Sequence, residues 1–221
     1  MSATKRLQKP QLSPRLLPIS GETVLQPEFI EFASVLLDRT DFTAQRAAHL
    51  TFTDVHCKQV RWRDSRLHGV RCTDVRFAGC DLANATWEQF VAHRVELLDC
   101  QLLGWNAPEA HLQNVRFQGC HGQLANFRFA TFKQVRFEEC DLRQADFQRA
   151  DLSGVVFHKC DLRGAQLSGT TLKGTDFRGS QIDDLRVGIQ ELPGAIVDPF
   201  QAAYIAGLLG IVIKGEDDKL S

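Results

Sequence analysis

The chain has 221 residues, of which 43% are hydrophobic and 24% charged, and its formal net charge is −1. This balance is ordinary for a folded protein, and it excludes a strongly basic protein that binds nucleic acid or a membrane surface through bulk charge. The seven cysteines, in a chain whose first residues contain no apolar signal segment, favour free thiols and a cytoplasmic location.

Residues 1–24 are rich in proline, lysine and serine and show no sustained periodicity. Such a composition offers little apolar surface to bury. We therefore expect residues 1–24 to form a flexible N-terminal tail that precedes the folded part of the chain.

Residues 25–190 follow a period of five. From Phe42 to Val187, every fifth residue is apolar at 29 of 30 positions, and Gly122 is the exception. The residue two positions earlier is usually small or β-branched, and polar turn-forming residues fill the remaining places. A helix repeats every 3.6 residues and a strand every two, so neither explains this pattern. We expect each group of five to form one short inward-facing strand followed by a corner.

A longer period of twenty lies within the period of five. Cysteine recurs at this spacing from Cys80 to Cys160, and phenylalanine recurs from Phe117 to Phe177. Four corners per coil would stack such residues in columns along the axis. The sequence therefore predicts an all-β solenoid of about 7–8 coils with about 20 residues per coil. The cysteines should be small buried residues, because a straight column cannot surround a metal ion.

The phrase Cys140-Asp141-Leu142, repeated as Ala145-Asp146-Phe147 and Ala150-Asp151-Leu152, resembles the pentapeptide-repeat family. The resemblance implies a right-handed quadrilateral β-helix. The segment 192–213 is also similar to the C-terminal region of the quinolone-resistance members, which bind DNA gyrase or topoisomerase IV by imitating duplex DNA. The resemblance therefore implies a topoisomerase partner and a role in antibiotic resistance.

The charges of the array leave a second function open. Residues 40–187 contain 19 lysines and arginines and 18 aspartates and glutamates, so the rod has no excess of carboxylates. The alternative is a general protein-interaction scaffold with an unrelated partner. Outward positions lack the interleaved aromatic residues of a nucleic-acid groove, so no direct nucleic-acid binding is expected. The sequence contains no nucleophile elbow, P-loop or dinucleotide motif, and we expect neither an enzyme nor a cofactor.

Two groups of residues are candidates for partner binding. Residues 86–110 break the rule of small residues, since Phe90 and Trp105 occupy small positions. This indicates either a locally distorted coil or an exposed apolar patch that docks a partner. The candidate residues of the patch are Leu98, Leu103, Leu124 and Phe129. The second candidate is an arginine cluster, formed by Arg61, Arg63, Arg66, Arg71 and Arg76.

Residues 191–214 should cap the open end of the solenoid. Asp198 is the expected N-cap of a short helix, Pro199 its first residue and Gly210 its stop. Both faces of this helix are apolar, so we expect either a fully packed cap or a homodimer through a short strand that follows the helix. The candidate residues are Phe200, Tyr204, Ile205, Leu208, Leu209, Ile211 and Ile213. The segment is too short to cross a membrane, and residues 215–221 form a charged tail.

Overall fold

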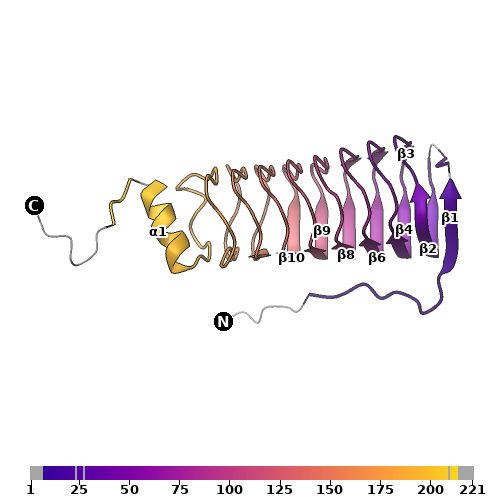
Figure 1. Ribbon diagram of the computed structural model, residues 1–221, viewed down its shortest axis with the longest axis horizontal. Coiled ribbons are helices and arrows are strands. Elements are labelled where there is room, and N and C mark those ends of the chain that lie inside the picture. The colour runs from indigo at the N-terminus through magenta and orange to yellow at the C-terminus, as the bar shows by residue number, and fades with distance from the viewer. Residues whose placement is uncertain (1–6, 23, 27, 209, 214–221) are drawn as a thin grey trace, which may run out of the picture.

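The structure, a computed structural model, describes residues 7–22, 24–26, 28–208 and 210–213. The chain winds into a β-solenoid of about seven turns with about 20 residues per turn. Figure 1 shows the turns stacked along a rod, with strand β1 (Leu17–Glu22) at one end and helix α1 (Pro199–Leu208) at the other. The predicted fold class, the length of the coil and the short C-terminal helix are therefore confirmed.

Parallel strands of successive coils pair with one another at a constant offset. Val55, for example, lies opposite Val35 in one neighbouring coil and Val75 in the other, which is an offset of 20 residues. The main sheet contains, in spatial order, β1, β2 (Glu31–Asp41), β4 (Thr51–Lys58), β6 (Arg71–Ala78), β8 (Val91–Leu98), β9 (His111–Gln118), β10 (Thr131–Glu138) and β11 (Val156–His158). A second sheet contains β3 (Arg46–Ala48), β5 (Arg66–His68) and β7 (Thr86–Glu88).

Tight turns form many of the corners, and the repeated phrase supplies their chemistry. At one corner the backbone N–H of Ala145 donates to the carbonyl oxygen of Leu142 at 3.1 Å, and Gln144 has a φ of 57°. A positive φ at the third residue is the geometry of a type II turn. The carboxylate of Asp141 accepts the backbone N–H of Arg143 at 3.2 Å. The aspartate of each phrase is thus a local turn-forming residue.

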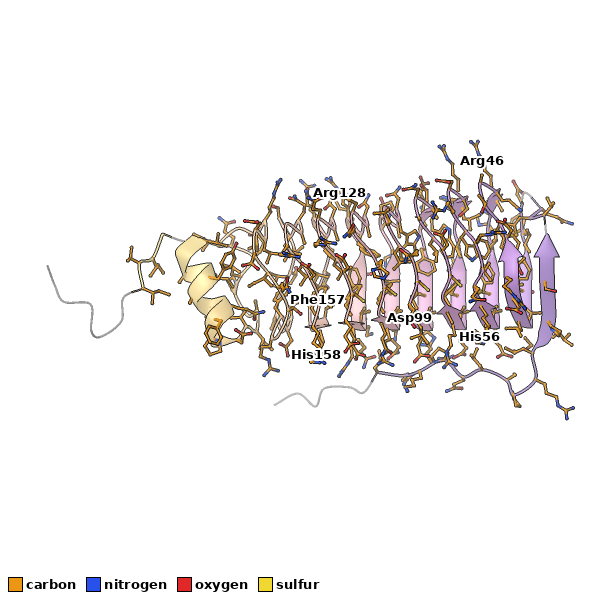
Figure 2. The ribbon with its side chains drawn as sticks, viewed as in Figure 1. Arg46, His56, Asp99, Arg128, Phe157 and His158 are labelled. Atoms are coloured by element: carbon orange, nitrogen blue, oxygen red, sulfur yellow. The ribbon has the colours of Figure 1, made fainter. Side chains whose placement is uncertain are left out.

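The core consists of columns of identical or similar side chains. The rings of Phe117, Phe137, Phe157 and Phe177 stack nearly parallel, with successive centroids 4.5, 5.1 and 5.3 Å apart. Figure 2 shows Phe157 within the rod, whereas Arg128 lies at its rim. Full burial of one such side chain contributes about 1.5–3 kcal/mol. Stacking along the axis therefore replaces the layer-on-layer packing of an ordinary domain.

The cysteine column lies inside the rod, as predicted. All seven cysteines are buried and free, including the five that recur every twenty residues. Burial raises the pKa of Cys57 and of Cys72 above the ordinary value of a thiol. Leu142 and Leu162 are also buried. The backbone of Asp141, next to Leu142, forms a parallel β-bridge with the backbone of Asp161, next to Leu162 in the following coil. The thiols therefore act as small buried residues of the core.

Residues 86–110 keep the regular coil, so the interpretation as a distorted coil is wrong. Phe90 and Trp105 are fully buried, and β8 pairs in continuous register with β6 and β9. The order of sizes is simply inverted: alanine follows each of these residues two positions later, as Ala92 and Ala107. Each side of the coil still contributes one large and one small side chain to the core.

Part of the segment expected to be a flexible tail is ordered. Residues 17–22 form β1, which pairs with β2 and covers the first coil. Pro18 lies in this strand at the edge of the sheet, and it removes a donor that another chain could pair with. Figure 1 also shows the described residues before β1 running back along the rod.

Candidate functional site

Most corners have one residue with a positive φ, and this position is usually occupied by glycine or by a polar residue. The left-handed region is strained for other residues, by about 1 kcal/mol or more for a large side chain. Large apolar residues in this conformation are Phe29, Leu124 and Phe129 within the described ranges. Phe29 stacks on His49 at the first coil, with ring centroids 5.0 Å apart.

Leu124 and Phe129 lie at the two ends of one side of a coil, and both are exposed. The exposed fractions are 56% for Leu124, 44% for Phe129 and 42% for Leu103. Leu103 occupies the same corner as Leu124 one coil earlier, where the N–H of Gly104 donates to the carbonyl oxygen of Gln123 at 2.8 Å. We call Leu103, Leu124 and Phe129 the Leu–Phe patch. These residues combine exposed apolar area with, in two cases, a strained backbone, and neither property stabilises the fold.

Two arginines flank the aromatic ring of the patch. The guanidinium carbons of Arg128 and Arg149 lie 5.8 and 5.6 Å from the ring centroid of Phe129. Both distances are within the range of cation–π attraction. An aromatic ring with arginines beside it is the composition typical of the energetic centre of a protein–protein interface.

Shallow depressions adjoin the leucines of the patch. A depression of about 860 Å³ begins at Leu124 and is lined by Arg143, Arg163 and Arg186 among other residues. A second one, of about 390 Å³, lies beside Leu103 and also reaches Arg143. The apolar residues are therefore bordered by polar hollows, which is the arrangement of an apolar centre with a polar rim.

Four aspartates of the C-terminal half, Asp141, Asp146, Asp161 and Asp176, form ion pairs with neighbouring arginines. Arg163 donates to Asp161 at 2.6 Å, and Arg178 donates to Asp176 at 2.7 Å. These hydrogen bonds outweigh burial and hold the pKa of both carboxyls below the ordinary value. Since each carboxylate also accepts a backbone N–H in its own turn, this strip of aspartates does not present rows of free negative charge.

The Pentapeptide repeat region model matches three overlapping stretches of the chain, residues 70–147, 91–167 and 125–187. Together they span more than half of it. The chain belongs to the pentapeptide-repeat family.

Individual relatives of this pentapeptide-repeat protein are distant. It is 35% identical to the uncharacterized protein YisX of Bacillus subtilis (strain 168) over 77 residues, which are 35% of this chain and 36% of YisX. The matched part is thus about a third of that relative. The solved structure of QnrB1, a plasmid-mediated fluoroquinolone resistance protein, is 20% identical with a TM-score of 0.42, covering 86% of this chain and all of the other. HetL, involved in heterocyst differentiation regulation in the cyanobacterium Nostoc sp. strain PCC 7120, is 16% identical with a TM-score of 0.35, covering 76% and 87%.

The pentapeptide coil disperses the predicted arginine cluster. Arg61, Arg66, Arg71 and Arg76 are five residues apart, so each lies on a different side of one coil. Arg63 follows Arg61 at the corner and pairs with Asp81 at 2.8 Å. Arg61 pairs with Asp41 and Arg76 with Glu96, each also at 2.8 Å. The five side chains circle the rod and do not form a common basic surface.

Leu98 does not join the Leu–Phe patch. It is half-buried in β8, between Ala78 and Gln118 of the neighbouring strands. The corner that carries it is a different one from that of Leu103, because five residues separate them. Sequence reasoning missed Arg128 and Arg149, although the spacing of twenty already places residue 149 next to residue 129 in the following coil.

The C-terminal cap is anchored by a polar residue. The backbone N–H of Gln201 donates to the carboxylate of Asp198, and the N–H of Asp198 donates to the amide oxygen of Gln201, each at 3.0 Å. This reciprocal capping box confirms the predicted start of the helix. The amide nitrogen of Gln201 also donates to the carbonyl oxygens of Phe177 and Ser180, both at 2.7 Å, and so closes the last coil. Gly210, with a φ of 75°, follows the helix as expected.

One face of helix α1 packs against the solenoid, and the other is open. Gln201, Tyr204 and Ile205 face the solenoid, whereas Phe200 is 89% exposed and Leu208 is also exposed. The reason is that the side chain of Gln201 points into the solenoid to donate to the carbonyl oxygens of Phe177 and Ser180, and the preceding residue, Phe200, therefore points outward. A fully packed cap is therefore wrong. Ile211 and Ile213 are exposed and lie in no strand, and Leu209 lies outside the described residues.

The described ranges contain no group of three or more histidine, cysteine, aspartate or glutamate residues that could hold a metal ion. Within the same ranges, no helix has the length and hydropathy needed to cross a membrane.

Proposed function

We propose that this pentapeptide-repeat solenoid is a non-enzymatic, rigid protein-binding module whose contact surface is centred on the Leu–Phe patch. The observation that carries the proposal is the pair Leu124 and Phe129, which combine a left-handed backbone with an exposed apolar side chain. Strain at an exposed position is a sign of function where the surrounding fold does not need the residue. The free thiols agree with action in the cytoplasm.

The other residues at these two corners support this interpretation. Gly104 occupies the corner of Leu124 one coil earlier and Gly164 two coils later, and Gly169 occupies the corner of Phe129 two coils later. The turn itself is therefore satisfied by glycine, and nothing in the coil requires a large apolar side chain. A partner that covers the patch would bury the two apolar side chains and exclude water from the arginines beside Phe129.

The test compares two doubly substituted proteins. Leu124→Gly with Phe129→Gly removes the two patch side chains that have a left-handed backbone and relieves the strain, so the variant should remain folded. Asn84→Gly with Gln89→Gly is the matched control, because these residues have the same positive φ at the same two corners two coils earlier. We expect the patch variant to bind a purified partner at least roughly tenfold more weakly, and the control to bind normally. Equal binding by both variants would refute the role of the patch.

The exposed apolar face of α1 favours one narrower candidate, a topoisomerase-binding dimer of the quinolone-resistance type. The C-terminal segment resembles that subgroup, and the outward Phe200 and Leu208 are available to a second copy of the chain. The ion-paired aspartates count against imitation of duplex DNA by the described rod. Because of the resemblance in the C-terminal segment, purified gyrase and topoisomerase IV are the first partners to test. The readouts are the supercoiling activity of gyrase, the decatenation activity of topoisomerase IV and the protection of both enzymes from quinolones.

The same candidate requires a dimer through the cap. The expected outcome is a molecular mass of about twice the 24.8 kDa of the chain in light scattering, reduced to the monomer by Phe200→Ser with Leu208→Ser. A monomer at all concentrations, together with unchanged topoisomerase activity, would remove this candidate and leave the general protein-binding module.

A further inference from the structure

Residues 7–16, which we call the N-terminal strap, cross the coils on the outside of the rod. Figure 1 shows this segment leaving β1 and running back along the stacked strands. The strap is extended and has no regular secondary structure. It contacts surface residues that are far away in the sequence, up to 106 positions for the bond between Gln8 and Asn114.

One column of corner residues holds the strap. The backbone N–H of Ser13 donates to the carboxylate of Asp54 at 2.7 Å, and that of Gln11 donates to Asp74 at 2.9 Å. The N–H of Gln8 donates to the side-chain oxygen of Asn114 at 3.1 Å. The three acceptors are separated by multiples of twenty residues, so they lie on the same corner of different coils. All three have a positive φ, which aspartate and asparagine tolerate best after glycine.

The two carboxylates are held in place by neighbours in the same column. Ser34 donates to Asp54 at 2.7 Å, and Arg94 donates to Asp74 at 2.6 Å. Arg94 and the N–H of Gln11 together outweigh burial, so the pKa of Asp74 lies below its ordinary value and the group is ionised near neutral pH. A fixed, charged acceptor in each of two adjacent coils is suited to the N–H groups of an extended peptide.

The donors of the strap in these three hydrogen bonds are all backbone groups. The apolar side chains of Leu7, Pro10, Leu12 and Leu16 are half-buried, whereas Lys9 and Arg15 are exposed. The hydrogen bonds between the strap and this column end on side chains of the rod, so the strap does not extend a sheet there. The strap is therefore attached to the column through three hydrogen bonds to side chains, without the backbone pairing of a strand.

The column continues beyond the described end of the strap. A depression of about 520 Å³ lies at Leu7 and Gln8 and is lined by His93, Gln113, Asn114, Lys133 and Gln134. Gln134 occupies the same corner as Asn114 in the following coil and also has a positive φ.

We propose that the column formed by Asp54, Asp74 and Asn114 is a binding track for an extended, basic, proline-interrupted segment of a partner protein, and that the strap occupies this track when the partner is absent. The chemistry of the partner segment is that of the strap: backbone N–H groups toward the track, apolar side chains on the rod and basic side chains outward, as Lys9 and Arg15 are in the strap. The track lies on a different corner from the Leu–Phe patch, and it is independent of the function proposed above.

Full-length variants can release the strap without deleting it. Gln11→Pro with Ser13→Pro removes the two N–H groups that donate to Asp74 and Asp54. Gln11→Ala with Ser13→Ala keeps these N–H groups and serves as the matched control. The probe is a fluorescent synthetic peptide with the sequence of residues 7–16, followed by fluorescence anisotropy. We expect the proline variant to bind this peptide at least roughly tenfold more tightly than the wild type or the alanine variant, because no internal strap competes.

A second pair of substitutions tests the track itself. Asp54→Gly with Asp74→Gly removes the acceptors but suits the positive φ, and Gly154 and Gly174 already occupy this corner in later coils. Placed in the proline variant, these substitutions should abolish peptide binding and leave the thermal unfolding temperature nearly unchanged. Peptide binding that is equal in all variants, or that survives loss of both aspartates, would overturn the proposal. A dimer of the wild type that the glycine substitutions dissociate would show a second copy as the occupant and would also overturn it.

Discussion

The inverted pair Trp105 and Ala107 gives the sharpest test of how the core is filled. Both side chains are fully buried, and on the equivalent side of the coils before and after, the pairs are Ala85 with Trp87 and Ala125 with Phe127. If each side needs one large residue in either place, then exchanging the two sizes at residues 105 and 107 should preserve the fold. The indole N–H of Trp105 has no hydrogen-bond partner among the described residues, so its removal breaks no bond.

The magnitudes follow from the chemistry of core substitutions. Trp105→Ala alone should lower the free energy of unfolding by about 3–5 kcal/mol through the cavity that it leaves. Ala107→Phe alone should lower it by about 1–3 kcal/mol through overpacking. The double variant, in contrast, conserves volume approximately and should lose less than about 2 kcal/mol. Its new ring would lie between Trp87 and Phe127, in a column where Phe127 and Phe147 already stack with centroids 5.3 Å apart.

Urea unfolding of the four proteins, followed by circular dichroism, measures the cycle. The expected coupling energy is at least about 2 kcal/mol in the stabilising direction, with equal dependence on urea in all four proteins. If the double variant loses as much as the two single variants together, about 4–8 kcal/mol, the two positions do not share one volume and the reasoning is refuted.

Three further outcomes are expected. A maleimide reagent should label none of the seven thiols in the native protein and all seven in urea, and rapid labelling without urea would contradict the buried column. The free energy of unfolding should fall as the pH drops below about 3.8. The pKa values of Asp161 and Asp176 are lowered in the folded protein, so in this pH range the unfolded chain binds more protons than the folded one. A thermal unfolding temperature that stays constant from pH 5 to pH 2 would exclude this linkage. Gln201→Ala should lower the free energy of unfolding by about 1–3 kcal/mol, because the carbonyl oxygen of Ser180 loses its side-chain donor and that of Phe177 keeps only the backbone N–H of Ser180. Unchanged unfolding would show that the cap does not seal the coil.

The periods of five and twenty predicted the solenoid because the apolar character of a side chain decides whether it faces inward, and the narrow core restricts its size. The same frame correctly placed Leu103, Leu124 and Phe129 outside. The predicted arginine cluster was wrong, because residues five apart occupy successive sides of the coil. Only residues twenty apart lie next to each other in neighbouring coils. A predicted surface cluster in such a fold therefore has to be sought down a column and not along the chain.

The remaining features left little trace in the pattern. The strap is held through its backbone N–H groups, so its side chains do not reveal where it lies. The helical periodicity of the cap predicted two apolar faces but not which one is buried. Gln201 decided that, and only its spacing from Asp198, as in a capping box, could have indicated its role.

Because the coils pair at a constant offset of 20 residues, the number of residues between two positions determines both their distance along the rod and the angle between them around its axis. An insertion of five residues anywhere in the coils would turn everything after it by a quarter of a revolution, whereas an insertion of twenty would add about 4.8 Å of length and leave every direction unchanged. The direction in which the cap helix points relative to Phe129 is thus encoded by a residue count. Insertion of whole coils would thus lengthen the rod, and insertion of a single repeat would re-aim one surface against another at the cost of new neighbours between the coils that meet at the insertion.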